Sequence, residues 1–157
     1  MKRLHIYVDT SVIGGCEDEE FSGVSLRLWS KFRSGTFMLV ISDLTLQELA
    51  GAPASVRRHL EDISTAHQIQ VCLTEEAREL ADAYLARGVV GPGSLADALH
   101  VALATVNAVD VLVSWNFKHI VNFGRIRLFN AVNLEQGYGL IEIRTPREVL
   151  HEGEEDI

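Results

Sequence analysis

Three acidic residues stand where an α/β protein commonly carries out chemistry. Asp9 follows the apolar run LHIYV, Glu48 lies shortly after the run FMLVI, and Asp97 interrupts the almost wholly apolar segment LADALHVALA. In an open parallel sheet, ligands collect at the carboxyl ends of the strands, because loops and helix N-termini converge there. Carboxylates gathered at that edge would repel one another without a cation, and their hard oxygens suit Mg²⁺ or Mn²⁺. The sequence therefore predicts a divalent-metal site that activates water to hydrolyse a phosphodiester.

Each of these acids also has an ordinary structural explanation. Asp9 could cap the helix or turn that follows it, and Glu48 could be an exposed helical side chain. Asp97 could share a capping box with Ser94, three residues earlier. His100 lies one turn after Asp97, but no second His or Cys accompanies it at metal-ligand spacing. We therefore expect His100 to be hydrogen-bonded in the core and not to bind zinc.

The stretch VSWNFKHI, at the end of the last long apolar run, carries an uncharged Asn116. Its amide offers one neutral oxygen, so it can hold a metal-bound water but adds less to cation affinity than a carboxylate would. Asp110 precedes the same run and should lie at the opposite edge of the sheet. We expect Asn116 to be the neutral fourth corner of the site, and Asp110 to be structural.

Apolar runs and helical patterns alternate along the chain. Ser42 and Thr74 stand at helix-capping positions. The strands are predicted at residues 4–8, 37–41, 69–73, 109–114 and 140–143, and the helices at 24–33, 43–49, 54–66, 75–86 and 94–107. Strands that are apolar throughout and separated by helices predict an α/β fold, a three-layer α/β/α sandwich around a central, mainly parallel sheet of four to five strands. We expect one domain over residues 1–150 and a disordered acidic tail over residues 151–157.

Composition limits the classes of function. The chain has 157 residues and a net charge of −8, which argues against a surface that is basic all over but allows a local basic rim. Cys16 and Cys72 fit no disulfide or metal spacing, so we read them as reduced thiols of a cytoplasmic protein. No stretch has the pattern of a signal peptide or the length of a membrane span.

The order of these motifs resembles the PIN domain, a small Mg²⁺-dependent nuclease fold that includes the VapC-type toxins of toxin–antitoxin pairs. The resemblance rests on the segments YVDTS, SDLTLQEL and DALHVA, the last followed by VDVLVS, and it spans nearly the whole chain. It implies that Asp9, Glu48 and Asp97 bind the metal, and that Asn116 stands where the family commonly has a fourth acid. It also implies an RNA substrate, an antitoxin partner and a homodimer.

Three functions compete at this stage. The first is a metal-dependent ribonuclease, the toxin of such a pair. The second is an RNA-binding or regulatory module whose catalysis is weakened or lost because Asn116 replaces the fourth acid. The third, a nucleotide-binding protein, is disfavoured because VDTSVIGG has neither a dinucleotide fingerprint nor a phosphate-loop Lys.

Contacts to nucleic acid are predicted only as a set. Trp115 could stack on a base or pack into the core. The candidates for phosphate contacts are Arg57, Arg58, Lys118, His119, Arg125 and Arg127.

Overall fold

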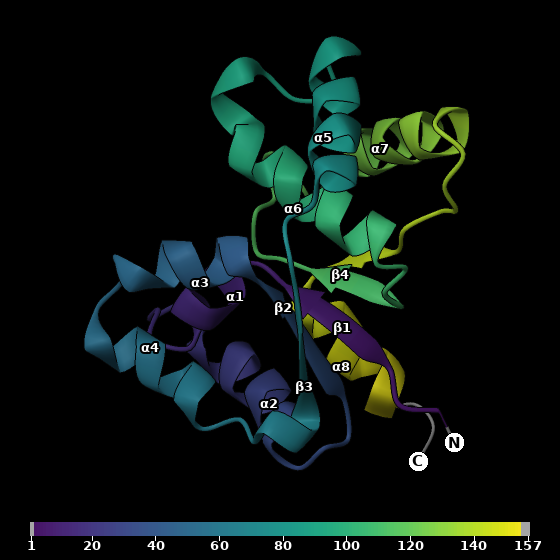
Figure 1. Ribbon diagram of the computed structural model, residues 1–157. Coiled ribbons are helices and arrows are strands. Elements are labelled where there is room, and N and C mark those ends of the chain that lie inside the picture. Colours follow the sequence, from purple (N-terminus) through teal and green to yellow (C-terminus); the bar gives the residue numbers. More distant parts are fainter. Residues whose placement is uncertain (1, 155–157) are drawn as a thin grey trace.

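The computed structural model describes residues 2–154, with side chains described for residues 2–150. Within that range, five parallel strands form one sheet in the order β3, β2, β1, β4, β5 (Figure 1). The strands are β1 (His5–Val8), β2 (Met38–Ser42), β3 (Gln68–Val71), β4 (Val111–Val113) and β5 (Ile143–Arg144). The predicted parallel sheet is therefore confirmed, with β1 at its centre.

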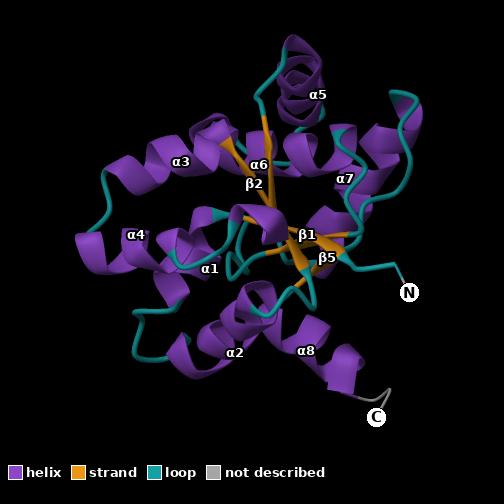
Figure 2. Cartoon of the chain, turned by 60° about the horizontal axis from the view of Figure 1, so that its bottom comes forward, coloured by secondary structure: helices purple, strands orange, loops and turns teal. Residues whose placement is uncertain are grey.

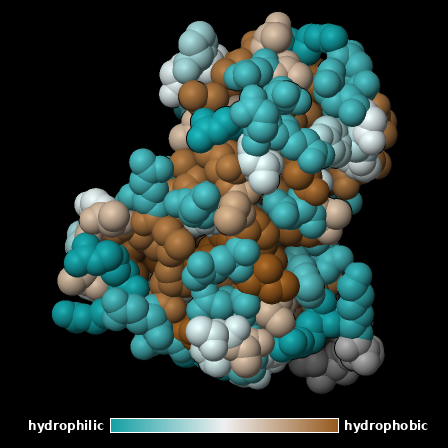
Figure 3. All heavy atoms as spheres, in the orientation of Figure 1, coloured by the Kyte–Doolittle hydropathy of each residue, from teal (hydrophilic) through white to brown (hydrophobic). Residues whose placement is uncertain are grey.

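Helices cover both faces of the sheet, as the turned view shows (Figure 2). One face carries α5 (Glu75–Ala86), α6 (Leu95–Val106) and α7 (Phe123–Glu135). The other carries α1 (Thr10–Gly15), α2 (Ser22–Arg33), α4 (Ala54–Glu61) and α8 (Pro146–Glu154), while α3 (Asp43–Ala50) leads directly out of β2. Hydrophilic residues cover much of the outer surface, and apolar residues are visible between the upper and the lower group of helices in this view (Figure 3). The predicted three-layer α/β/α sandwich is confirmed.

The central strand supplies both cores. Successive side chains of a strand point to opposite faces, so Ile6 and Val8 pack on the α2 side while Tyr7 packs on the α6 side. All three are fully buried, and so is most of β2 and β4. Because helices cover both faces of the sheet, side chains on both sides of these strands are apolar, and the strands appear in the sequence as continuous apolar runs. It also brings the Tyr7 hydroxyl into the α6-side core.

Two predictions in the middle of the chain are wrong for local reasons, one about where a helix ends and one about the burial of a strand. The helix expected over residues 54–66 ends at Glu61, and a separate 3₁₀ turn spans Thr65–His67. Buried Ile63 lies between them, and the Ser64 hydroxyl starts the turn by accepting the N–H of Ala66. The strand expected over residues 69–73 is an edge strand with Ile69 exposed, so burial on both faces does not hold there.

The C-terminal third departs most from prediction. The last strand lies at Ile143–Arg144 and not at residues 140–143, and α7 and α8 were not predicted. Near the N-terminus, α1 was expected only as a helix or turn after Asp9. Helix α7 buries Phe129 and Val132 but exposes Leu128 and Leu134, so its sequence lacks a single apolar face. Helix α8 runs to Glu154, four residues into the segment expected to be a tail, and residues 155–157 lie outside the described residues. None of the helices in the described part of the chain has the length and hydropathy of a membrane span.

Asp110 lies at the amino-terminal edge of the sheet, opposite to Asp9, as expected. Its Oδ2 accepts the N–H of His5 at 2.7 Å, and its own N–H donates to the His5 carbonyl at 3.0 Å. The residue therefore joins the start of β4 to the start of β1. Its role is structural.

We predict that Asp110→Ala destabilises the fold without touching the candidate site. Loss of one side-chain acceptor should cost about 1–2 kcal/mol. For a chain of this size the midpoint of thermal unfolding should fall by roughly 2–8 °C. Calorimetry measures the shift, and Mn²⁺ titration of the same variant is the control. Weakened Mn²⁺ binding with an unchanged midpoint would contradict the structural role.

Candidate functional site

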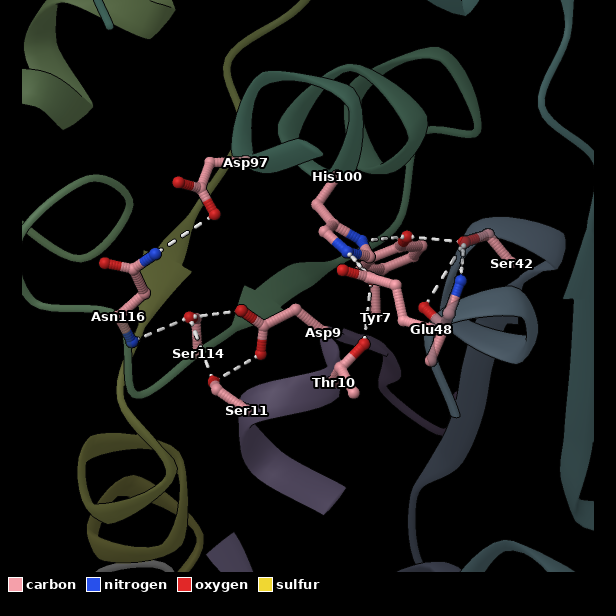
Figure 4. A network of polar contacts seen from close by, with 11 residues as sticks. Tyr7, Asp9, Thr10, Ser11, Ser42, Glu48, Asp97, His100, Ser114 and Asn116 are labelled. Carbon is pink, nitrogen blue, oxygen red and sulfur yellow. Dashed lines mark hydrogen bonds and ion pairs between the residues drawn. The ribbon is translucent and has the colours of Figure 1, made fainter. Parts of the chain in front are cut away.

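The carboxyl ends of β1, β2 and β4 bring the predicted site residues to one edge of the sheet (Figure 4). Asp9 directly follows β1, and Asp97 lies in the first turn of α6. Asn116 follows β4, and Glu48 lies on α3 after β2. In the close view Asp9 is central, with Asp97 and Asn116 to its left and Glu48 to its right.

Asp9 is a buried carboxylate held by two hydroxyls. Only 4% of the residue is exposed, and its oxygens accept from Ser11 Oγ at 2.6 Å and Ser114 Oγ at 2.7 Å. Burial raises the pKa of Asp9, while nearby His100 and the two hydroxyls lower it. Asp9 occupies the N-cap position of α1, as one of the two expectations had it, and the backbone N–H of Val12 in the first turn also lowers its pKa.

Asp97 lies beside Asn116. The Asn116 amide nitrogen donates to Asp97 Oδ1 at 3.1 Å. Burial raises the pKa of Asp97, nearby His119 lowers it, and the charge of Asp9 raises it again. The side chain of Ser94 makes no cap bond to α6, so the predicted capping box is wrong. Asp97 and Asp9 are thus two carboxylates close enough to affect each other.

Asn116 presents a donor, not an acceptor, to the acids. Its Oδ1 accepts the N–H of His119 at 2.9 Å while its Nδ2 faces Asp97. Reversing the amide would place an oxygen against a carboxylate and an NH₂ group against an N–H, so both contacts fix this orientation. The backbone N–H of Asn116 also donates to Ser114 Oγ at 2.9 Å. Asn116 therefore links Asp97 to the hydroxyl that holds Asp9.

Glu48 is engaged by other partners. Its Oε1 lies 2.6 Å from His100 Nε2 and accepts from Thr10 Oγ1 at 2.9 Å. The hydrogen bond from His100 is the main cause that lowers the pKa of Glu48, and burial opposes it. His100 is buried, and its Nδ1 lies 2.7 Å from the Tyr7 hydroxyl, so the expectation of a hydrogen-bonded core His is confirmed.

The donor set bears on the expected metal. Among residues 2–150, whose side chains the structure describes, no group of three or more His, Cys, Asp or Glu side chains is arranged to hold an ion. Asp9 and Asp97 nevertheless share the features of a cation site, because both are hard oxygen donors whose pKa is raised and whose charges repel. A divalent cation fits this pair chemically. Glu48 lies on the far side of Asp9 in Figure 4, bonded to His100 and Thr10.

Several of the residues predicted to contact nucleic acid also make contacts with other groups of the same chain. Arg125 donates to the carbonyls of Lys118 and Val89, so it holds two loops together. Arg57 donates to the carbonyl of Ala52. The Arg127 guanidinium lies over the ring of Phe123, 5.7 Å from its centroid. Arg57, Arg58, Lys118 and Arg127 are all exposed at the surface.

Trp115 packs into the core, where its Nε1 donates to Ser25 Oγ at 2.8 Å. The ring that faces solvent is its neighbour Phe117, which is 51% exposed. Phe117 lies beside Trp115 and Phe21, with ring centroids 6.1 Å and 6.4 Å away. Of the two alternatives for Trp115, packing into the core is therefore the one observed.

Two hydroxyl groups of the site, those of Ser114 and Tyr7, were not predicted from the sequence. A signal for Ser114 exists, because Val8 pairs with Val113 in the β1–β4 register. The next residues, Asp9 and Ser114, must then lie side by side. Recognising this contact requires the strand register, which the sequence alone does not supply.

The fold and the site define a class of protein: an α/β/α sandwich with acids at the carboxyl edge of its parallel sheet. A family model, the PIN domain, matches residues 6–117. The match runs from β1 to just beyond β4 and includes all four predicted site residues. The chain belongs to the PIN-domain family. Comparison with curated proteins gave no match.

Solved structures with a similar fold are VapC toxins and their complexes. VapC20 of Mycobacterium tuberculosis, described as a sarcin-ricin loop cleaving toxin, is 20% identical, with a TM-score of 0.56 over 73% of this chain and 92% of that one. VapBC2 of Rickettsia felis, bound to a promoter DNA fragment, is 13% identical, with a TM-score of 0.57 over 90% and 98%. DNA-bound VapBC of Salmonella typhimurium is 19% identical, with a TM-score of 0.54 over 91% and 98%. At these identities the likeness is one of fold.

We predict that Asp9→Asn raises the thermal stability of the metal-free protein. Burial raises the pKa of Asp9 in the folded state above its unfolded value. The ionised side chain therefore disfavours folding, and the penalty grows as the pH rises through the interval between the two values. Asn is neutral and of similar size; its one carbonyl oxygen can accept from one of the two hydroxyls, of Ser11 or Ser114, and its NH₂ group can donate to the other. A gain of about 1 kcal/mol would raise the midpoint by roughly 2–4 °C.

Calorimetry in EDTA at neutral pH measures this shift. Asp110→Asn, at the opposite edge of the sheet, is the matched control and should not gain stability. A midpoint below that of the wild type would show that the carboxylate of Asp9 stabilises the fold.

A second prediction concerns Asn116→Asp. The new carboxylate keeps an oxygen for the His119 N–H but replaces the donor facing Asp97 by a like charge. Stability in EDTA should fall, while Mn²⁺ affinity should rise by roughly tenfold, about 1.4 kcal/mol. Calorimetric titration with Mn²⁺ measures the affinity. An affinity equal to that of the wild type would place residue 116 outside the metal site.

Proposed function

We propose that this protein is a metal-dependent endoribonuclease that hydrolyses RNA phosphodiesters, and that it is the toxin of a toxin–antitoxin pair. The observation that carries the proposal is a pair of neighbouring carboxylates at the carboxyl edge of a PIN-domain sheet: Asp9, which is buried, and Asp97, which is half-buried and whose pKa the charge of Asp9 raises. Their ionised forms are disfavoured by burial. A ligand of opposite charge accounts for them better than the fold does.

Asp9 and Asp97 would hold Mg²⁺ or Mn²⁺, and Glu48 would complete the site from α3. When bound, the ion would activate a water and stabilise the charge that develops on the phosphate. The chain itself fixes the carboxylates: Ser11 and Ser114 hold Asp9, and Asn116 holds Asp97. Glu48 has a side chain that is 35% exposed, so it can reach substrate at the rim.

The partners are proposed on the same basis. The M. tuberculosis relative is described as cleaving the sarcin-ricin loop, which supports an RNA substrate. The R. felis and S. typhimurium relatives are VapBC complexes on DNA, which supports an antitoxin that binds this chain. We also propose a homodimer and a cytoplasmic site of action. The homodimer follows from the family resemblance, and the cytoplasmic site of action from the interpretation of Cys16 and Cys72 as reduced thiols.

One observation favours a second function, an RNA-binding or regulatory module with weakened catalysis. Within the side chains described, those of residues 2–150, the acids do not form a cluster of three, and Asn116 adds no fourth charge. Such a module would bind RNA without cleaving it. The two functions therefore separate in one assay.

We predict that the purified protein cleaves RNA with Mn²⁺ or Mg²⁺ and not in EDTA. Asp9→Asn and Asp97→Asn should each lower the rate by more than roughly 100-fold, beyond the loss typical of an outer-shell partner. Asp110→Asn should cleave like the wild type. Cleavage that survives both site substitutions, or that ignores chelator, would falsify the assignment. RNA binding without cleavage at any metal concentration would favour the module.

A further inference from the structure

A chain of hydrogen bonds runs from the buried core to Glu48 at the rim of the site. The Ser42 and Tyr7 hydroxyls are 2.8 Å apart, and the Tyr7 hydroxyl lies 2.7 Å from His100 Nδ1. His100 Nε2 then lies 2.6 Å from Glu48 Oε1. Ser42 and Tyr7 are fully buried and His100 is 3% exposed, whereas the Glu48 side chain is partly exposed. Figure 4 shows the four side chains in this order.

The direction of the chain follows from its ends. A carboxylate oxygen can only accept, so His100 Nε2 carries the proton that faces Glu48. In a neutral imidazole Nδ1 is then an acceptor, and the Tyr7 O–H donates to it. The Tyr7 oxygen in turn accepts from Ser42, whose own oxygen accepts the N–H of Thr45 at 3.2 Å. When the imidazole is neutral, the Nε2–H tautomer is the one that satisfies both the Glu48 and the Tyr7 contacts.

Both donors that reach Glu48 bind the same oxygen. His100 Nε2 and Thr10 Oγ1 each contact Oε1. The carboxylate is therefore held on two sides through one atom. Oε2 is the oxygen left to face a ligand.

We propose that Tyr7 and His100 are positioning residues, which fix the orientation of Glu48 and leave Oε2 to face the site. The inference rests on the proposed function, in which Glu48 serves the metal and its substrate. Outer-shell partners of this kind hold a ligand's geometry, and their loss typically costs 10- to 100-fold in metal affinity. The alternative is that Tyr7 and His100 merely fill the core.

A pair of His100 variants separates positioning from packing. His100→Gln places an amide donor near Nε2, whereas His100→Asn reaches only the position of Nδ1. Calorimetric titration with Mn²⁺ should show a roughly 10- to 100-fold loss of affinity for His100→Asn. His100→Gln should stay within roughly threefold of the wild type. Equal loss in both variants, or loss in neither, would overturn the positioning role.

Tyr7→Phe tests the next bond of the chain, and Tyr84→Phe is its matched control. Tyr84 is equally buried on the same side of the sheet, and its hydroxyl bonds Asn133, away from the site. Each change removes one buried hydroxyl, so the thermal midpoints should fall similarly. Only Tyr7→Phe should lower Mn²⁺ affinity. An equal effect of Tyr84→Phe would mean that general destabilisation is the cause.

The tautomer of His100 gives a readout that needs neither metal nor RNA. Long-range ¹H–¹⁵N spectra of the metal-free protein at mildly alkaline pH should show His100 as the Nε2–H form. Tyr7→Phe should shift the Nδ1 signal by removing its donor, and Tyr84→Phe should not. A wild-type Nδ1–H form, or unchanged spectra in Tyr7→Phe, would overturn the inference. If the wild type neither binds Mn²⁺ nor cleaves RNA, the proposed function fails, and these spectra still decide the hydrogen-bond chain.

Discussion

The buried carboxylate of Asp9 is the constraint around which this edge of the sheet is arranged. An ionised group removed from water needs compensation. Here the compensation comes from two hydroxyls, one from Ser11 in the next turn and one from Ser114, 105 positions away in sequence. The second is available only because β1 and β4 pair in parallel with Val8 opposite Val113. The register of the β1–β4 pair therefore determines which hydroxyl can stabilise the Asp9 carboxylate.

The neutrality of Asn116 follows from the same constraint. Asp97 already carries the cost of burial and of its neighbour's charge, both of which raise its pKa. A third carboxylate at position 116 would increase the repulsion, whereas the amide of Asn116 relieves it by donating to Asp97. We expect an amide at this position to stabilise the metal-free fold and to lower cation affinity relative to an acid. Sites that bind ligands are where such local conflicts are retained.

Local sequence patterns were sufficient to predict the sheet, its parallel pairing and the edge to which Asp9, Asp97, Glu48 and Asn116 belong. They work because a buried strand and the residue that ends it are neighbours in the chain. They fail where contacts are distant or periodicity is absent. Ser114 and His100 acquire their partners through strand register and helix packing. Helix α7, with apolar residues on several sides, offers no period to read.

From the sequence alone the three acids were assigned the same role, but in the structure their surroundings shift their pKa values in different directions. Burial raises the pKa of Asp9 and Asp97, whereas the bond from His100 lowers the pKa of Glu48. Acids whose environments push their pKa values apart commonly have different roles. Asp9 and Asp97 gain most from a cation, since their ionised forms are the ones disfavoured. Glu48 is stable as an anion without one, because Thr10 and His100 already satisfy its Oε1. The edge of the sheet therefore combines two acids, Asp9 and Asp97, whose ionised forms need a counter-charge, with a third, Glu48, whose ionised form is already stabilised by hydrogen bonds.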